Sequence, residues 1–200
     1  MLSIGKRIAR NCCARWVLLA CALFCASAHA ETRVYLIRGW FGVFSTGLDQ
    51  IAAELRTKGI HAETIAHLQW KSTATEIVSE RAVLADGPLV LVGHSQGGND
   101  AIKLAREVQP HGVTVDLLIA LAPFLQDPVP TNVKRAVNYY QSGGWGSPLT
   151  PAAGFAGEIV NVDMGSDAGT FHINIDKNRD VQVKVVAAIT ALAQRARSRD

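Results

Sequence analysis

The serine with the most informative surroundings lies in the segment Gly93-His94-Ser95-Gln96-Gly97, which matches the pattern G-x-S-x-G. A fully apolar run precedes this segment and helix-forming sequence follows it, which is the strand–turn–helix context that the pattern requires. In so tight a turn, a side chain on either glycine would collide with neighbouring backbone. The pattern predicts that Ser95 is a nucleophile at the apex of this turn, where the free N–H groups of a helix start favour negative charge. The alternative is an ordinary glycine-serine turn.

A serine hydroxyl needs a base to become a good nucleophile. In α/β architectures with this serine turn, the base follows the serine in the chain and lies after the last strand. His111 comes at the end of the helix after Ser95, which points to the opposite edge of the sheet. His94 belongs to the turn and is expected to pack rather than to react. His172, between the last short strand and the last helix, is therefore the predicted base; the alternative is a surface histidine.

Attack by Ser95 would place negative charge on a carbonyl oxygen, and two backbone N–H groups are expected to stabilise that charge. One belongs to Gln96, the residue after the nucleophile. The other is expected in the loop after the first strand, where Gly39 and Gly42 let the backbone lie close to a substrate. Trp40 is the candidate donor in this loop. The alternative for the loop is a simple glycine turn.

Strands and helices alternate along the chain and would position these residues. Apolar and β-branched runs predict strands at 33–37, 61–66, 88–92, 113–121, 133–140 and 158–162. Helical periodicity predicts helices at 48–58, 75–85, 97–108 and 181–196. The apolar run 88–92 is typical of a strand buried on both faces of a parallel sheet. The alternation predicts one α/β domain with a mainly parallel sheet flanked by helices.

Charge and cysteines are unevenly distributed. Residues 1–30 hold four of the twenty basic residues and no acidic one, so 31–200 carry sixteen basic and seventeen acidic residues, a net charge of −1. This balance argues against a nucleic-acid partner. All four cysteines also precede residue 31, so the remainder has no disulfide, thiolate nucleophile or cysteine metal site. No two histidines have helical i,i+4 spacing, and neither a metal nor another cofactor is expected.

The first thirty residues have the three parts of a secretory signal peptide. Residues 1–15 are basic, 16–26 are apolar without charge, and Ala28-His29-Ala30 is an A-x-A cleavage pattern. The apolar run is too short for a membrane-spanning helix, which needs about 20 residues. A lipoprotein signal at Cys21 would leave only about five apolar residues, below the usual 7–15. We therefore expect cleavage after Ala30 and a mature domain of residues 31–200, without a membrane span, in the periplasm or outside the cell.

Residues 93–97, the Gly39-Trp40 pair and His172 together resemble the α/β-hydrolase superfamily, in particular its small secreted bacterial serine esterases, lipases and thioesterases. The resemblance covers nearly all of 31–200. It implies a minimal fold without a cap domain, since only 126–132 separate two expected strands. It also implies acyl transfer to water through an acyl-enzyme, in which Ser95 attacks a small-molecule acyl ester and His172 takes and returns the proton.

The superfamily places an acidic residue after one of the two strands that follow the serine helix. After the later strand, residues 128–157 contain no Asp or Glu. Asp127, after the earlier strand, is therefore the predicted third member, with a turn residue before Pro128 as the alternative. Asp163 and Asp167, shortly before His172, are the other candidates for the acid.

Aromatic residues on two expected loops are candidates for binding an acyl group. Phe41 on the first loop, with Trp145 and Phe155 on the glycine-rich stretch 142–157, are predicted to line an apolar groove beside Ser95. The alternative is that they only cover the core. The leading function is hydrolysis of carboxylic esters, lipid or other acyl esters. The alternatives are a thioesterase with the same machinery, and a non-catalytic acyl- or lipid-binding protein that has lost the acid.

Overall fold

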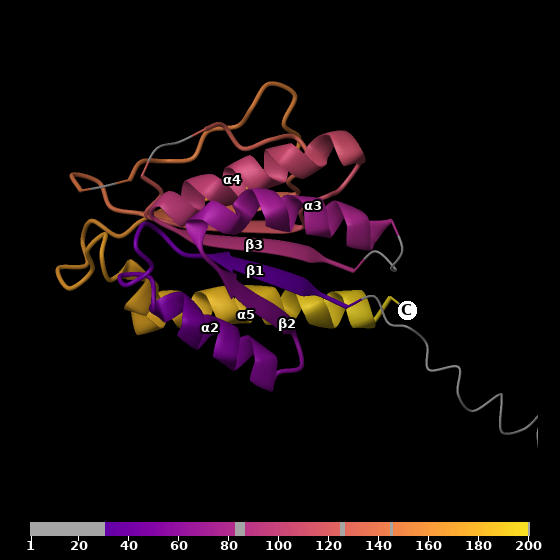
Figure 1. Cartoon of the computed structure of the whole chain (residues 1–200). Helices are drawn as coiled ribbons and strands as arrows, with labels where there is room; N and C mark the ends of the chain where they lie inside the picture. The colour runs from indigo at the N-terminus through magenta and orange to yellow at the C-terminus, as the bar shows by residue number, and fades with distance from the viewer. Residues whose placement is uncertain (1–30, 83–86, 125–126, 145, 200) are drawn as a thin grey trace, which may run out of the picture.

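The structure is a computed structural model that describes residues 31–82, 87–124, 127–144 and 146–199 (Figure 1). The expected signal peptide and Trp145 lie outside the described residues. Six parallel strands form one sheet in the order β2-β1-β3-β4-β5-β6. The strands are β1 Arg33–Ile37, β2 His61–Ile65, β3 Leu89–His94, β4 Leu117–Leu121, β5 Arg135–Tyr140 and β6 Glu158–Asp163.

Two pairs of helices cover the two faces of this sheet (Figure 1). One face carries α2 Gly47–Thr57 and α5 Arg179–Arg197, and the other carries α3 Trp70–Arg81 and α4 Gln96–Val108. Short 3₁₀ segments occupy His67–Gln69 (η1), Gln109–His111 (η2) and Ile175–Lys177 (η3). Within the described ranges, no helix combines the length and the apolar character that a bilayer crossing requires. The predicted α/β architecture with a parallel sheet is confirmed.

Alternation along the strands produces two cores, one on each face of the sheet. In β1, Val34 and Leu36 pack on the side of α2 and α5, whereas Tyr35 and Ile37 pack on the side of α3 and α4. All six residues of β3 are buried, which explains why its sequence is a continuous apolar run rather than an alternating one. Each fully buried Leu or Ile contributes about 1.5–3 kcal/mol, so this central strand is held firmly where the site needs it.

Of the expected elements, two differ most from the sequence prediction in where they start. The helix expected from residue 75 begins at Trp70, because Thr73 and Ala74 are buried and extend the packed face by a turn. The strand expected from residue 113 begins at Leu117. Its start is fixed by Asp116, whose carboxylate accepts a hydrogen bond from the backbone N–H of Leu89 at 3.0 Å.

The connection from β5 to β6 crosses the sheet without a helix in its described part. Two asparagines on neighbouring strands, one buried and one exposed, hold it there. Asn138 on β5 donates to the carbonyl of Ser147 at 2.9 Å. Asn161 on β6 accepts from the N–H of Leu149 at 2.7 Å and donates to its carbonyl at 3.1 Å. This irregular segment therefore returns from the carboxyl end of β5 to the amino end of β6.

Candidate active site

The turn between β3 and α4 has the geometry that the glycine pattern predicts. Ser95 links His94, the last residue of β3, to Gln96, the first residue of α4, with φ 56° and ψ −124°. A Cβ atom on Gly93 would lie 2.1 Å from the carbonyl oxygen of Gly97. A Cβ atom on Gly97 would lie 2.0 Å from the carbonyl oxygen of Ile37. The expected collision of a side chain at either glycine is confirmed, and Ser95 stands at the carboxyl edge of the sheet.

His172 meets Ser95 from the loop after β6. Its Nε2 atom lies 2.8 Å from the Oγ atom of Ser95, across 77 residues of sequence. The loop is braced at buried Thr170, whose carbonyl accepts a hydrogen bond from Gln141 Nε2 at 2.8 Å. Asp167 accepts a hydrogen bond from the Thr170 hydroxyl at 2.6 Å. The structure therefore brings together the serine and the histidine that the sequence singles out.

The loop after β1 approaches Ser95 through its first glycine. A Cβ atom on Gly39 would lie 3.1 Å from the Cβ atom of Ser95, so only a glycine fits there without displacement. Trp40 follows directly, which places its backbone beside the serine. On the other side, Gln96 is the first residue of α4, so its N–H has no acceptor within the helix. Both predicted oxyanion residues therefore adjoin Ser95.

His94, the residue before Ser95, contacts both of these loops. Its Nε2 atom lies 2.7 Å from the carbonyl oxygen of His172, and its Nδ1 atom lies 2.8 Å from Ser45 Oγ. Ser45 in turn accepts a hydrogen bond from the N–H of Gly39 at 3.0 Å. Burial lowers the pKa of His94 to about 4, and the hydrogen bond to the His172 carbonyl opposes that shift only partly. The imidazole is therefore neutral at ordinary pH.

Asp176 is a completely buried carboxyl group beneath the same loops. Its Oδ2 atom accepts the N–H of Gly47, the first residue of α2, at 2.8 Å. Its Oδ1 atom lies 3.9 Å from Nδ1 of His94. Burial raises the pKa of Asp176 to about 6, while the hydrogen bond from Gly47 and the charge of Lys177 lower it less. The sequence analysis missed this group, because no local pattern links an aspartate to a helix 129 residues away.

Asp127, the predicted acid, lies beside α4 and away from His172, so that prediction needs correction. Its carboxylate pairs with Arg106 at 3.4 Å, and the same guanidinium donates to the carbonyl of Pro128 at 2.8 Å. Arg106 is eleven residues after Ser95 in the chain, which is about 16 Å along the axis of α4. Asp127 therefore lies beside the C-terminal part of α4, far from the end of the helix that follows Ser95. It behaves as the turn residue that was given above as the alternative.

The two alternative acids organise loops instead. Asp163, the last residue of β6, accepts hydrogen bonds from the backbone N–H groups of Ser142 and Gly165. The hydrogen bonds of Ser142, followed by that of Gly165, hold the pKa of Asp163 below its usual value. Asp167 accepts from Gly169 and Thr170 in the His172 loop, and the Thr170 hydroxyl is the main cause of its lowered pKa. Both carboxylates therefore accept hydrogen bonds from the loops in which they lie.

The loops at the carboxyl edge carry most of the exposed large apolar side chains. Eight of the nine found in the described residues lie on loops or short segments at this edge, and only Val183 lies on a long helix. We call the eight the apolar rim: Trp40, Phe41, Val43, Phe44, Leu68, Phe124, Phe171 and Ile173. Phe41 is 86% exposed and has a positive φ of 61°. The ring centroids of Trp40 and Phe124 are 6.0 Å apart, so two loops on either side of Ser95 touch.

Of the predicted acyl-binding aromatics that the structure describes, Phe41 lies at this edge and Phe155 does not. Phe155 precedes β6 and packs against the core on the side of α3 and α4. The prediction was wrong for Phe155, because the segment from β5 to β6 must run to the amino edge of the sheet before β6 can start parallel to β5. Trp145 is outside the described residues.

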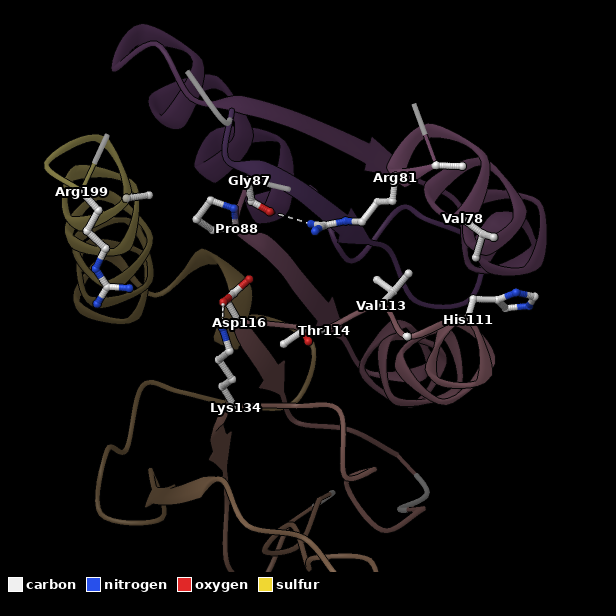
Figure 2. A pocket seen from close by; sticks show the side chains of 13 residues that line it. Val78, Arg81, Gly87, Pro88, His111, Val113, Thr114, Asp116, Lys134 and Arg199 are labelled. Atoms are coloured by element: carbon white, nitrogen blue, oxygen red, sulfur yellow. Dashed lines mark hydrogen bonds and ion pairs between the residues drawn. The ribbon is translucent and has the colours of Figure 1, made fainter. Parts of the chain in front are cut away.

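Two cavities differ in their relation to Ser95. One of about 240 Å³ is lined by Gln141, Gly144, Phe171, His172 and Ile173. A larger one of about 550 Å³ lies at the amino ends of the strands (Figure 2). Its charged groups are engaged within the protein: Lys134 pairs with Asp116 at 2.7 Å, and Arg81 donates to the carbonyl of Gly87. The smaller cavity, which His172 lines, is therefore the one that adjoins the Ser95–His172 contact.

His111 lines the larger cavity, so it lies at the edge of the sheet opposite Ser95, as its position after the serine helix predicted. Among the residues that the structure describes, no three His, Cys, Asp or Glu side chains gather in a way that could hold a metal ion.

Comparisons with known proteins were made for both sequence and structure. Neither the scan against protein-family models nor the search of curated proteins finds a match. Solved structures do match. A novel cutinase-like protein from Cryptococcus sp. is 12% identical with a TM-score of 0.53, covering 84% of this chain and 97% of its own. Est1E from Butyrivibrio proteoclasticus is 12% identical with a TM-score of 0.52, and the match covers 84% of this chain and 89% of Est1E.

The type II thioesterase BorB from the borrelidin biosynthetic cluster is likewise 12% identical, with a TM-score of 0.50, covering 80% of this chain and 93% of its own. Identities this low establish the arrangement of strands and helices rather than the chemistry. The six-stranded parallel sheet, the flanking helices and these neighbours agree with one another. The chain therefore has a minimal α/β-hydrolase fold.

Proposed function

We propose that the protein is a serine hydrolase that cleaves carboxylic esters through an acyl-enzyme intermediate. The observation that carries this proposal is the 2.8 Å contact between Ser95 Oγ and His172 Nε2 at the apex of a strand–turn–helix. A nucleophile within hydrogen-bond reach of its base is the arrangement that covalent catalysis by serine requires.

The proposed reaction has two halves that use the same two side chains. Ser95 Oγ attacks the ester carbonyl carbon while its proton passes to His172 Nε2. The N–H groups of Gln96 and Trp40 stabilise the negative oxygen of the tetrahedral intermediate. Collapse of the intermediate expels the alcohol, which takes the proton from Nε2. Water then attacks the acyl-enzyme, His172 accepts its proton, and the carboxylic acid leaves as Ser95 regains a proton.

Apolar surroundings favour an apolar acyl group as the substrate. The cavity beside His172 is bordered by Phe171 and Ile173, and the apolar rim surrounds the approach to Ser95. Apolar area removed from water contributes about 25 cal/mol per Å², so an acyl chain laid on this surface gains affinity in proportion to its length. The names of two neighbours, a cutinase-like protein and a thioesterase, are consistent with acyl substrates.

A fluorophosphonate probe tests the proposal directly, because it reacts only with an activated serine. We expect stoichiometric labelling of the folded protein, loss of labelling in Ser95→Ala and strong slowing in His172→Ala. Ser72→Ala, which changes an exposed serine in α3, is the matched control. Folded protein that resists labelling but binds fatty acyl ligands would identify a non-catalytic binding protein. Faster turnover of a thioester than of the matched oxygen ester would identify a thioesterase.

We also propose that residues 1–30 direct export and are removed, leaving Glu31 at the N-terminus in the periplasm or outside the cell. The basic start, the apolar run and Ala28-His29-Ala30 support this proposal. Intact-mass measurement of the protein exported by its native host should give a chain that begins at Glu31. A product that keeps Cys21 with an attached lipid would overturn the proposal.

A further inference from the structure

We propose that His94 is a positioning residue for catalysis, whose single neutral tautomer fixes the base loop and the oxyanion loop relative to the nucleophile. This inference rests on the proposed function. His94 does not touch the reacting atoms. It adjoins Ser95 in the chain, and its two ring nitrogens contact the two loops that must cooperate with Ser95.

The tautomer follows from the hydrogen-bond partners. The partner of Nε2 is the carbonyl oxygen of His172, which can only accept, so Nε2 carries the proton and donates. A neutral imidazole with a proton on Nε2 has a lone pair on Nδ1. Nδ1 therefore accepts from the hydroxyl of Ser45 at 2.8 Å. The Ser45 oxygen also accepts the N–H of Gly39 at 3.0 Å, so each of these groups has a defined role.

The hydrogen bonds of His94 lie only one or two residues from the groups proposed to act on the substrate. The His172 carbonyl belongs to the same residue as the base, so the bond from His94 fixes the backbone from which that imidazole extends. The bond through Ser45 fixes the backbone of Gly39, the residue before Trp40. The imidazole is 1% exposed, so water does not compete for either bond. A displacement of about 1 Å in such groups can lower a rate about 100-fold.

The neutral form is essential to this arrangement. A second proton on Nδ1 would remove the acceptor of the Ser45 hydroxyl and place a charge in the buried space beside Asp176, where the charge of exposed Lys177 disfavours a second cation. Burial favours the uncharged imidazole, which keeps the pattern of donors and acceptors fixed. Asp176 supports the same region by holding the start of α2, immediately after the oxyanion loop.

Two near-isosteric variants separate the two bonds. His94→Gln places an amide nitrogen near the position of Nε2 and keeps the donor to His172, but loses the acceptor for Ser45. His94→Asn places an amide oxygen near the position of Nδ1 and keeps that acceptor, but loses the donor. We expect each to lower kcat about 10- to 100-fold with a much smaller change in KM. His61→Gln, which changes an exposed histidine, is the matched control.

A double-mutant cycle with Ser45→Ala then assigns the bonds. Because His94→Gln already breaks the bond to Ser45, adding Ser45→Ala should cost less than it does in the unsubstituted protein, and what it still costs is the bond that Ser45 accepts from Gly39. Adding Ser45→Ala to His94→Asn should cost the full effect of the single Ser45 change, since that variant retains the bond. Additive losses in both cycles, or losses of kcat that only follow a lower melting temperature, would overturn the proposal.

Nitrogen NMR of the histidines gives a readout that does not depend on turnover. We expect one imidazole with a protonated Nε2 and an unprotonated Nδ1 that does not titrate above about pH 5, and its signal should disappear in His94→Gln. The opposite tautomer at His94 would refute the inference even if the enzyme is active. Absence of labelling at Ser95 together with the expected tautomer would instead reject the proposed function.

Discussion

The Oδ1 atom of Asp176 lies 3.9 Å from the Nδ1 atom of His94, and both side chains are buried. Their pKa values are displaced in opposite directions, because burial lowers the pKa of His94 to about 4 and raises the pKa of Asp176 to about 6. Each displacement disfavours the charged form of its group. The two groups therefore make opposite contributions to the pH dependence of stability.

Single neutral substitutions should reveal these opposite contributions. The pKa of His94 is lower in the folded than in the unfolded chain, so its contribution to the unfolding free energy falls as pH drops from about 6.5 to 4. The pKa of Asp176 is higher in the folded chain, so its contribution is lost as pH rises from about 3.8 to 6. Asp176→Asn should therefore make stability increase with pH, and His94→Gln should make it decrease.

Urea unfolding at pH 4, 5, 6 and 7 checks this prediction. Each group contributes no more than about 3 kcal/mol across its window, because one pKa unit corresponds to about 1.4 kcal/mol. The unsubstituted protein should show a flatter profile than either variant, and His61→Gln serves as the control. Parallel profiles for all four proteins would show that the two groups do not titrate as described.

Asparagine variants of the three candidate acids should separate loop residues from a triad member. Asp127→Asn should leave kcat/KM on a short activated ester nearly unchanged, because its carboxylate pairs with Arg106 far from His172. Asp163→Asn should also be nearly neutral. Asp167→Asn should lower the rate by less than about tenfold, by loosening Thr170. A loss of about 10⁴ in Asp127→Asn, as expected for a triad acid, would contradict the structure.

Removing one member of the apolar rim should weaken binding of long acyl chains. Phe41 is 86% exposed, so Phe41→Ser should leave the melting temperature unchanged. Burying a phenylalanine against a ligand contributes about 1.5–3 kcal/mol, so KM for a long-chain ester should rise about tenfold or more. KM for an acetate ester should change little. Val183→Ser on α5 is the matched control, and equal effects of both variants would place acyl binding elsewhere.

Features that depend on neighbouring residues in the sequence, such as the buried strand β3 and the turn at Ser95, were predicted correctly. The continuous apolar run before Gly93 predicted a strand buried on both faces, and the spacing of two glycines predicted the turn at Ser95. Loops were less predictable, because their course depends on where the next strand starts. Asp127 follows the end of β4 by six residues, yet it lies on a segment that has turned back toward the amino edge. Phe155 lies at the end of a long segment that has made the same return before β6 begins at Glu158.

The contacts of His94 and Asp176 could not be predicted from the sequence for a different reason. His94 and His172 are 78 residues apart, and Asp176 and Gly47 are 129 apart, so only the folded sheet brings them together. The residue type at position 94 also misleads, since a histidine next to a serine nucleophile suggests either chemistry or simple packing. Its hydrogen bonds to two loops give it a third role that no local sequence pattern encodes.

The backbone of Ser95 gives its proposed catalytic role a thermodynamic signature that can be measured without any substrate. At φ 56° and ψ −124° a Cβ atom is unfavourable, by about 1–3 kcal/mol, and only glycine adopts the region freely. Ser95→Gly should therefore unfold at a higher temperature than Ser95→Ala, the reverse of the usual ranking of these residues. An inactive descendant of this protein would gain stability by replacing the serine with glycine. Retention of serine at this position is thus a measure of how strongly selection for the reaction opposes selection for a more stable fold.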